Sequence, residues 1–124
     1  MENQHGDRRK EARKVVMAFT PVYNLKNGRL LGYLRDLTIK GAQVNGEKEL
    51  EVNTFITLSI QLPEDLPKIT APRLNIEARV ARRIATPENP NSFETGFEFK
   101  ELSSEQTQII EAILERYHFR HKMY

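Results

Sequence analysis

Residues 54–62 read TFITLSIQL, and apolar and polar side chains alternate along this stretch. In an extended chain successive side chains point to opposite faces, so a period of two gathers the apolar residues on one side. The residues on that face are Ile56, Leu58, Ile60 and Leu62. The stretch therefore predicts a β-strand with one buried face and a polar face, which includes Ser59, in solvent.

The same alternation recurs twice downstream. Residues 74–80 read LNIEARV and residues 93–99 read FETGFEF, so both predict half-buried strands. The segments between the three strands, residues 63–72 and 86–91, contain five of the six prolines. Proline cannot donate a hydrogen bond to a sheet, so these segments are predicted loops.

Three shorter segments upstream are rich in residues that favour strands. They are residues 15–23, 29–35 and 42–44. The pairs Asn27-Gly28 and Asn45-Gly46 predict tight turns, because both residue types tolerate a positive φ. The upstream part therefore predicts three more strands.

The period of the pattern changes beyond residue 102. Ser103 followed by Gln106 predicts a capping box at a helix start. Apolar residues then recur at helical spacing: Ile109, Ile110, Ile113, Leu114 and Tyr117. We expect a helix over about residues 104–118. Six short strands followed by one helix predict an all-β fold, closed into a barrel or a sandwich.

The composition excludes several classes of protein. The chain has 124 residues, which fits one domain, and it has no cysteine, which excludes disulfides and thiolate metal sites. Residues 1–14 are too charged for a signal peptide, and no apolar run approaches the roughly 20 residues that span a bilayer. We expect a cytoplasmic protein.

The sequence also lacks the combinations of residues that acid–base or nucleophilic catalysis requires. Histidine is absent from residues 6–117, and no hydroxyl or amine nucleophile has an identifiable base partner. His118 and His121 make a poor metal site, because two ligands without a carboxylate are too few, and a frayed tail is the better interpretation. We therefore expect no enzyme, no metal and no cofactor.

The positive charge is concentrated at the N-terminus. Residues 1–14 carry five basic and three acidic side chains, which account for the net charge of +2, and the other 110 residues sum to zero. A long polyanion usually requires a broad basic face, so neither DNA nor RNA is the expected partner. Residues 1–14 lack apolar periodicity and predict a flexible arm, followed by a barrel domain over residues 15–124.

Two short motifs could carry binding chemistry. Residues 9–13 read RKEAR, and an arginine fork can bind two phosphate oxygens or the O6 and N7 atoms of guanine in one plane. Residues 36–41 read DLTIKG, and a carboxylate there could accept from the N1–H and N2–H₂ edge of guanine. Alone, the first motif is typical of a solvated tail, and the second of an ordinary turn in which Gly41 supplies a positive φ.

Together the motifs resemble those of the PilZ family. RKEAR matches the RxxxR motif of that family, and DLTIKG matches its D/N-x-S/T-x-x-G motif, in the same order and about one strand pair apart. Residues 95–99, followed by a helix, resemble the last strand and helix of the family. The resemblance covers nearly the whole chain, and its one departure is Thr38, where serine is commoner.

The resemblance implies a six-stranded antiparallel split β-barrel that binds cyclic di-GMP and catalyses nothing. The implied ligand-binding residues are Arg8, Arg9, Arg13, Asp36, Thr38 and Gly41. Arg9 and Arg13 would clamp phosphates and guanine edges, while Arg8 could stack on a base and favour a stacked pair of ligands. The ligand would order the arm onto the barrel and change the surface offered to an unidentified effector protein. Formation of a homodimer around the ligand is a further possibility.

Two other functions stay open. An OB-like barrel could bind nucleic acid through strand aromatics, although Phe93, Phe97 and Phe99 share one strand face and are better interpreted as core. A PilZ-fold adaptor could act through protein contacts alone, although this chain keeps the motif residues. Arg82 and Arg83 could extend a ligand site, but alternation would point only one of them to any given face.

Overall fold

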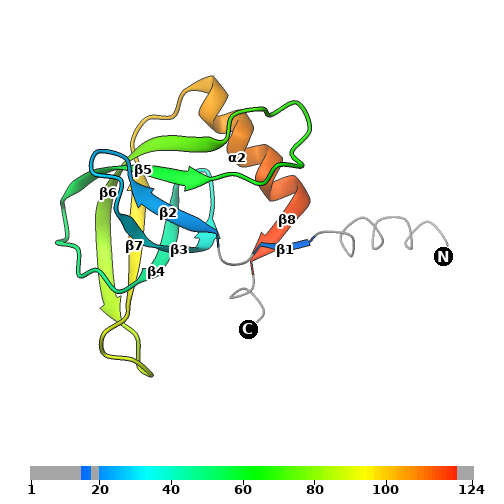
Figure 1. Cartoon of the computed structure of the whole chain (residues 1–124). Coiled ribbons are helices and arrows are strands. Elements are labelled where there is room, and N and C mark those ends of the chain that lie inside the picture. The colour runs from blue at the N-terminus through cyan, green and yellow to red at the C-terminus, as the bar shows by residue number, and fades with distance from the viewer. Residues whose placement is uncertain (1–14, 18–19, 120–124) are drawn as a thin grey trace, which may run out of the picture.

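The structure, a computed structural model, describes residues 15–17 and 20–119. Its elements are, in chain order, β1 (Val15–Met17), β2 (Pro21–Asn24), β3 (Leu30–Leu37), β4 (Gly41–Gly46), β5 (Phe55–Gln61), β6 (Arg73–Ala85), β7 (Phe93–Phe99), α2 (Ser104–Arg116) and β8 (Tyr117–Phe119). Figure 1 shows curved strands with α2 lying along one side of them. Within the described ranges, no helix combines the length and the apolar character that a bilayer crossing requires.

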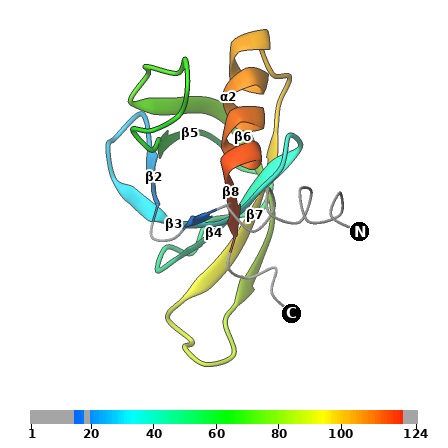
Figure 2. The same ribbon diagram turned by 90° about the vertical axis from the view of Figure 1, so that its right-hand side faces the viewer.

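Six of the strands close into a barrel. Their order is β2-β3-β4-β7-β6-β5, and every neighbouring pair is antiparallel. Figure 2 shows these strands curving around a ring, with α2 beside it. The prediction of an all-β fold, a six-stranded antiparallel barrel with one C-terminal helix, is confirmed.

The apolar side chains of the alternating stretches fill the inside of the barrel. Those of β5 and β6 are almost inaccessible to solvent: Leu58, Ile60, Leu74, Ile76 and Val80. Burial of each such side chain contributes roughly 1.5–3 kcal/mol.

Ser59, on the polar face of β5, is buried as well, although solvent exposure was expected there. The reason is a long side chain that covers it from outside. The guanidinium of Arg73 lies 4.7 Å from the centre of the Tyr23 ring, and its Nη1 donates to the Ser59 hydroxyl at 3.5 Å. An arginine stacked on a neighbouring aromatic ring can thus bury a residue that the alternation places outside.

The helix begins with the predicted capping box. The Ser103 hydroxyl accepts from the amide of Gln106 at 3.0 Å, and the Gln106 Oε1 accepts from the amide of Ser103 at 2.8 Å. The Gln106 Nε2 also donates to the carbonyl of Asn75 at 2.8 Å, which ties the helix start to β6. Ile109, Ile110 and Ile113 are buried, so the predicted apolar stripe packs on the core.

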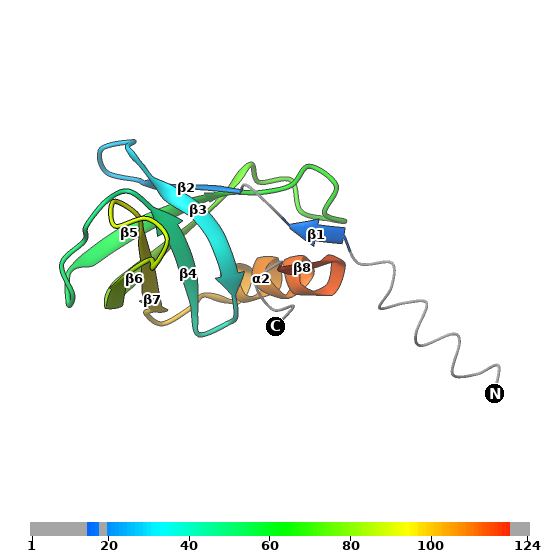
Figure 3. The same cartoon turned by 90° about the horizontal axis from the view of Figure 1, so that it is seen from below.

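The first predicted strand, residues 15–23, is wrong as a single element. The structure divides it into β1 and β2, and only β2 belongs to the barrel. β1 pairs in parallel with β8, and Met17 lies opposite Phe119, where both side chains are buried. Figure 3 shows this pair at the end of α2.

The helix predicted over about residues 104–118 ends at Arg116. Tyr117 is extended, with φ −128° and ψ 154°, because the following residues bury Phe119 as part of β8. His118 therefore lies in a strand and not in a frayed tail, while His121 lies outside the described residues.

Of the two predicted turns, one is confirmed and one is wrong. Asn27-Gly28 lies between β2 and β3, and Gly28 has a φ of +72°. Asn45-Gly46 instead ends β4 and pairs with β7. A Cβ atom on Gly46 would overlap the carbonyl oxygen of Leu31, so this glycine permits close contact between backbones and makes no turn.

Candidate functional site

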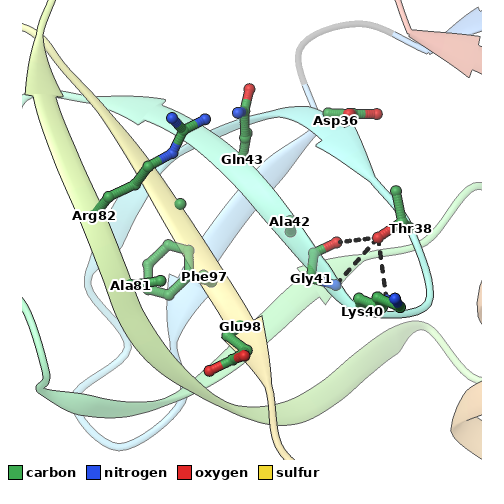
Figure 4. Close-up of a pocket in the computed structure, with 11 residues that line it drawn as sticks. Asp36, Thr38, Lys40, Gly41, Ala42, Gln43, Ala81, Arg82, Phe97 and Glu98 are labelled. Carbon is green, nitrogen blue, oxygen red and sulfur yellow. Dashed lines mark hydrogen bonds between the residues drawn. The ribbon is translucent and has the colours of Figure 1, made fainter.

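An open hollow of ≈ 270 Å³ lies on the outer wall of the barrel, over β3, β4, β6 and β7. Figure 4 shows the residues that line it. Three of the predicted ligand-binding residues are among them: Asp36, Thr38 and Gly41. The other polar side chains in the lining are Lys40, Gln43, Arg82 and Glu98. The volume is close to the lower end of the range for small-molecule sites, about 300–1,000 Å³.

Four residues of the hollow form one cross-strand row. Asp36 on β3 lies opposite Gln43 on β4, Gln43 lies opposite Gly96 on β7, and Gly96 lies opposite Arg82 on β6. Residues directly opposite in antiparallel strands share a face of the sheet. The row therefore carries a carboxylate at one end and a guanidinium at the other, and Gly96 between them has no side chain.

Both ends of the row follow a bulge in their strand. The register of β3 shifts between Leu34 and Asp36, and that of β6 shifts between Val80 and Arg82. Leu34 and Val80 are buried, so regular alternation would turn Asp36 and Arg82 inward as well. The extra residue in each bulge sends both charged side chains to the outer wall.

The turn between β3 and β4 is held by the Thr38 hydroxyl. Its Oγ1 accepts from the amides of Lys40 at 3.1 Å and Gly41 at 3.2 Å, and the Thr38 amide donates to the Gly41 carbonyl at 2.9 Å. The Thr38 Oγ1 lies 3.5 Å from the Gly41 carbonyl oxygen, so its hydroxyl donates only a weak hydrogen bond there. The same hydroxyl that shapes the turn can therefore donate to a ligand.

Gly41 has a different role from the one expected of a turn glycine. Among the described glycines, positive φ angles occur at Gly28 and Gly32, and not at Gly41. A Cβ atom on Gly41 would overlap the carbonyl oxygen of Phe97 on β7. The missing side chain thus lets β4 and β7 meet at the edge of the hollow.

Asp36 is half-buried at the end of β3, and its Oδ1 accepts from the amide of Leu37 at 2.8 Å. This bond holds the carboxyl group at the rim of the hollow. Across it lies Glu98, whose Oε1 pairs with the Arg79 Nη2 at 2.7 Å. Because Arg79 offsets the charge of Glu98, the acidic lining does not exclude an anionic ligand.

The structure separates Arg82 from Arg83. Arg83 lies away from the hollow, because it donates to the Leu50 carbonyl at 2.9 Å and pairs with Glu49 at 3.4 Å. Arg82 lines the hollow, and Figure 4 shows its guanidinium extending toward Gln43. Within the described ranges, the Arg82 guanidinium has no hydrogen bond or ion pair.

The predicted residues Arg8, Arg9 and Arg13 lie outside the described residues. The described chain begins with β1, two residues after Arg13, and β1 pairs with β8. β8 contacts β3, the strand that carries Asp36. The start of the described chain is therefore packed close to the strand that leads into the hollow.

Gln43 and Gly96 were not predicted as site residues. Gln43 stands between two buried residues of a short strand, which is the ordinary pattern of a solvent-facing side chain. Gly96 is one residue of the strand predicted over residues 93–99. No signal in the sequence distinguishes either residue, because their place in the hollow depends on the order of the strands.

The family model described as PilZ domain matches residues 7–117, which is most of the chain and includes both motifs. Neither a curated protein nor a solved structure gives a match.

Proposed function

The chain belongs to the PilZ domain family, and we propose that it is a receptor for cyclic di-GMP which acts through a partner protein. Domains of this family are in general non-catalytic receptors and adaptors for that dinucleotide. A receptor for this second messenger is expected to act in the bacterial cytoplasm, with an effector protein as its output.

One observation carries the proposal. Asp36, Thr38 and Gly41 line the same hollow, and Arg82 stands at its other end. A carboxylate can accept from the N1–H and N2–H₂ edge of guanine, and a guanidinium can bind phosphate oxygens or the O6 and N7 atoms. Both kinds of partner are present in a cyclic diguanylate.

In this proposal Arg9 and Arg13 clamp the ligand from the N-terminal side, and Arg8 stacks on a base. Micromolar affinity requires about 8 kcal/mol, and one charge-assisted hydrogen bond contributes roughly 1.5–3 kcal/mol. Fixing the backbone costs about 1–2 kcal/mol per residue, so the N-terminal arginines cannot supply the affinity alone. The hollow must contribute, and the ligand then joins residues 1–14 to the barrel as a new surface for a partner.

The alternative of a nucleic-acid-binding barrel has less support. Such barrels stack bases on exposed strand aromatics beside a basic groove. Phe97 and Phe99 on β7 are buried in the core, and the hollow mixes acidic with basic residues. Neither feature suits a long polyanion.

The direct test is isothermal titration calorimetry of the full chain with cyclic di-GMP. We expect saturable binding at micromolar concentration and a stoichiometry of one or two ligands per chain. GTP and cyclic di-AMP serve as controls. GTP has phosphates but only one guanine, and cyclic di-AMP has the same cyclic backbone but no guanine. Absence of binding at several hundred micromolar ligand would overturn the proposal.

A further inference from the structure

Gly96 differs from the other described glycines in what a side chain there would meet. A Cβ atom on Gly96 would find three side-chain atoms of Arg82 as its closest neighbours: Cγ at 3.0 Å, Nε at 3.2 Å and Cδ at 3.7 Å. At Gly32, Gly41 and Gly46, the atom closest to such a Cβ is a backbone oxygen. The space left by Gly96 is therefore occupied by the side chain of Arg82.

The register explains this contact. Gly96 lies directly opposite Arg82 across β6 and β7, at the first pair after the bulge in β6. The stem of Arg82 lies over the bare backbone of Gly96 and extends its guanidinium along the row toward Gln43. A long side chain that follows a neighbouring strand in this way keeps its apolar stem packed while its charged head faces solvent.

We propose that Gly96 is a positioning residue of the cyclic di-GMP site: its missing side chain lets Arg82 lie across β7 and hold its guanidinium over the hollow that Asp36 lines. The inference rests on the proposed function for its ligand. A guanidinium held in place before the ligand arrives loses less freedom on binding than one that points freely into solvent.

Alanine is a clean probe of this role. The φ of Gly96 is not positive, so alanine fits the backbone there. A Cβ at 3.0–3.2 Å from the Arg82 stem requires that side chain to move by a few tenths of an ångström, whereas no backbone atom is among its three closest neighbours. Gly96→Ala should therefore displace Arg82 and leave the barrel folded.

The test is a double-mutant cycle on the full chain, with cyclic di-GMP affinity measured by calorimetry and folding by thermal melting. We expect Arg82→Ala to weaken binding roughly tenfold and Gly96→Ala about threefold or more. In the Arg82→Ala background, Gly96→Ala should cause no further loss, because the residue through which it acts is gone. An equal loss in both backgrounds, or unchanged affinity in Gly96→Ala, would overturn the proposal.

Arg83→Ala is the matched control, because it removes the same charge one residue away on a side chain that points elsewhere. Its affinity should stay within about twofold of the unmodified chain. A second measurement needs no ligand: the Nε–Hε signal of Arg82 in a ¹H–¹⁵N NMR spectrum should shift in Gly96→Ala. If the unmodified chain binds no cyclic di-GMP, the proposed function is lost, and an unshifted Arg82 signal separately removes the positioning role.

Discussion

Asp36 on β3 and Arg82 on β6 stand at opposite ends of one row that crosses four strands, and each is the first paired residue after a bulge. Without the bulges both would continue the inward series of Leu34 and Val80, so charge would enter the core. Two local irregularities thus place a carboxylate and a guanidinium on the same outer surface. The candidate site depends on both.

The carboxylate of Asp36 is the first point to test. Asp36→Asn keeps an oxygen that can accept from the Leu37 amide, so the end of β3 should keep its shape. It loses the negative charge that would face the guanine edge, and we expect cyclic di-GMP affinity to fall roughly tenfold. Calorimetry measures the change, and a melting curve like that of the unmodified chain is the control. Equal affinity would remove Asp36 from the site.

Arg9 and Arg13 of the RxxxR motif are predicted to bind cyclic di-GMP. Arg9→Ala and Arg13→Ala should each weaken binding roughly tenfold, since each loses a charge-assisted fork. Melting temperatures of the same samples distinguish a loss of ligand contacts from a loss of stability. The control is Lys14→Ala, which removes a nearby charge outside the motif. If Arg9→Ala and Arg13→Ala both bind cyclic di-GMP as tightly as Lys14→Ala does, the N-terminal clamp is wrong.

Thr38 should tolerate serine and not valine. Valine removes the acceptor for the amides of Lys40 and Gly41, and each lost hydrogen bond is expected to lower the free energy of unfolding by about 0.5–1 kcal/mol, because water can reach these exposed amides. Thr38→Ser keeps the hydroxyl and should keep both stability and affinity. Urea unfolding of the two variants distinguishes them. Equal free energies of unfolding for Thr38→Val and Thr38→Ser would show that the turn does not need the hydroxyl.

We predict that the fold does not tolerate a side chain at Gly41. In Gly41→Ala the new Cβ would overlap the Phe97 carbonyl oxygen, and we expect a loss of about 2–3 kcal/mol in the free energy of unfolding. Gly28→Ala is the comparison, because its φ of +72° adds only local strain, about 1–2 kcal/mol, with open space around it. Chemical denaturation ranks the two, and the reverse order would contradict the close contact.

The loop before β6 is linked to the end of α2 by Asp65. The hydrogen bond from the Tyr117 hydroxyl, aided by Arg116, lowers the pKa of Asp65 below its ordinary value of 3.8. A depressed folded-state pKa contributes stability that is present above 3.8 and is lost as the pH falls through the lower folded value. Tyr117→Phe should therefore raise the pKa of Asp65 and reduce the loss of stability in acid.

Carboxyl NMR titration of Asp65 checks this prediction. The control is a ¹H–¹⁵N spectrum of Tyr117→Phe that matches that of the unmodified chain away from Asp65 and the end of α2. An unchanged titration curve for Asp65 in Tyr117→Phe would show that the hydrogen bond does not hold the carboxylate.

Local sequence patterns were sufficient to predict a strand or a helix where that element buries one of its own faces. The strands with clean alternation and the Ser103–Gln106 capping box could be predicted because their periods of 2 and 3.6 lie within a few neighbouring residues. Predictions failed where the partner is distant. The pairing of β1 with β8 divides residues 15–23 and ends the helix at Arg116, and no window of sequence contains both strands.

The strands, the C-terminal helix and the motif residues Asp36, Thr38 and Gly41 follow from the sequence, because apolar periodicity and short motifs are properties of neighbouring residues. The periodicity left a barrel and a sandwich open, and the barrel was expected only from the resemblance to the PilZ family. That Gln43, Gly96 and Arg82 join Asp36 in one row cannot be predicted from neighbouring residues and is visible only in the folded barrel. Strand order and register bring together residues that are far apart in the chain, and two bulges choose which of them face outward.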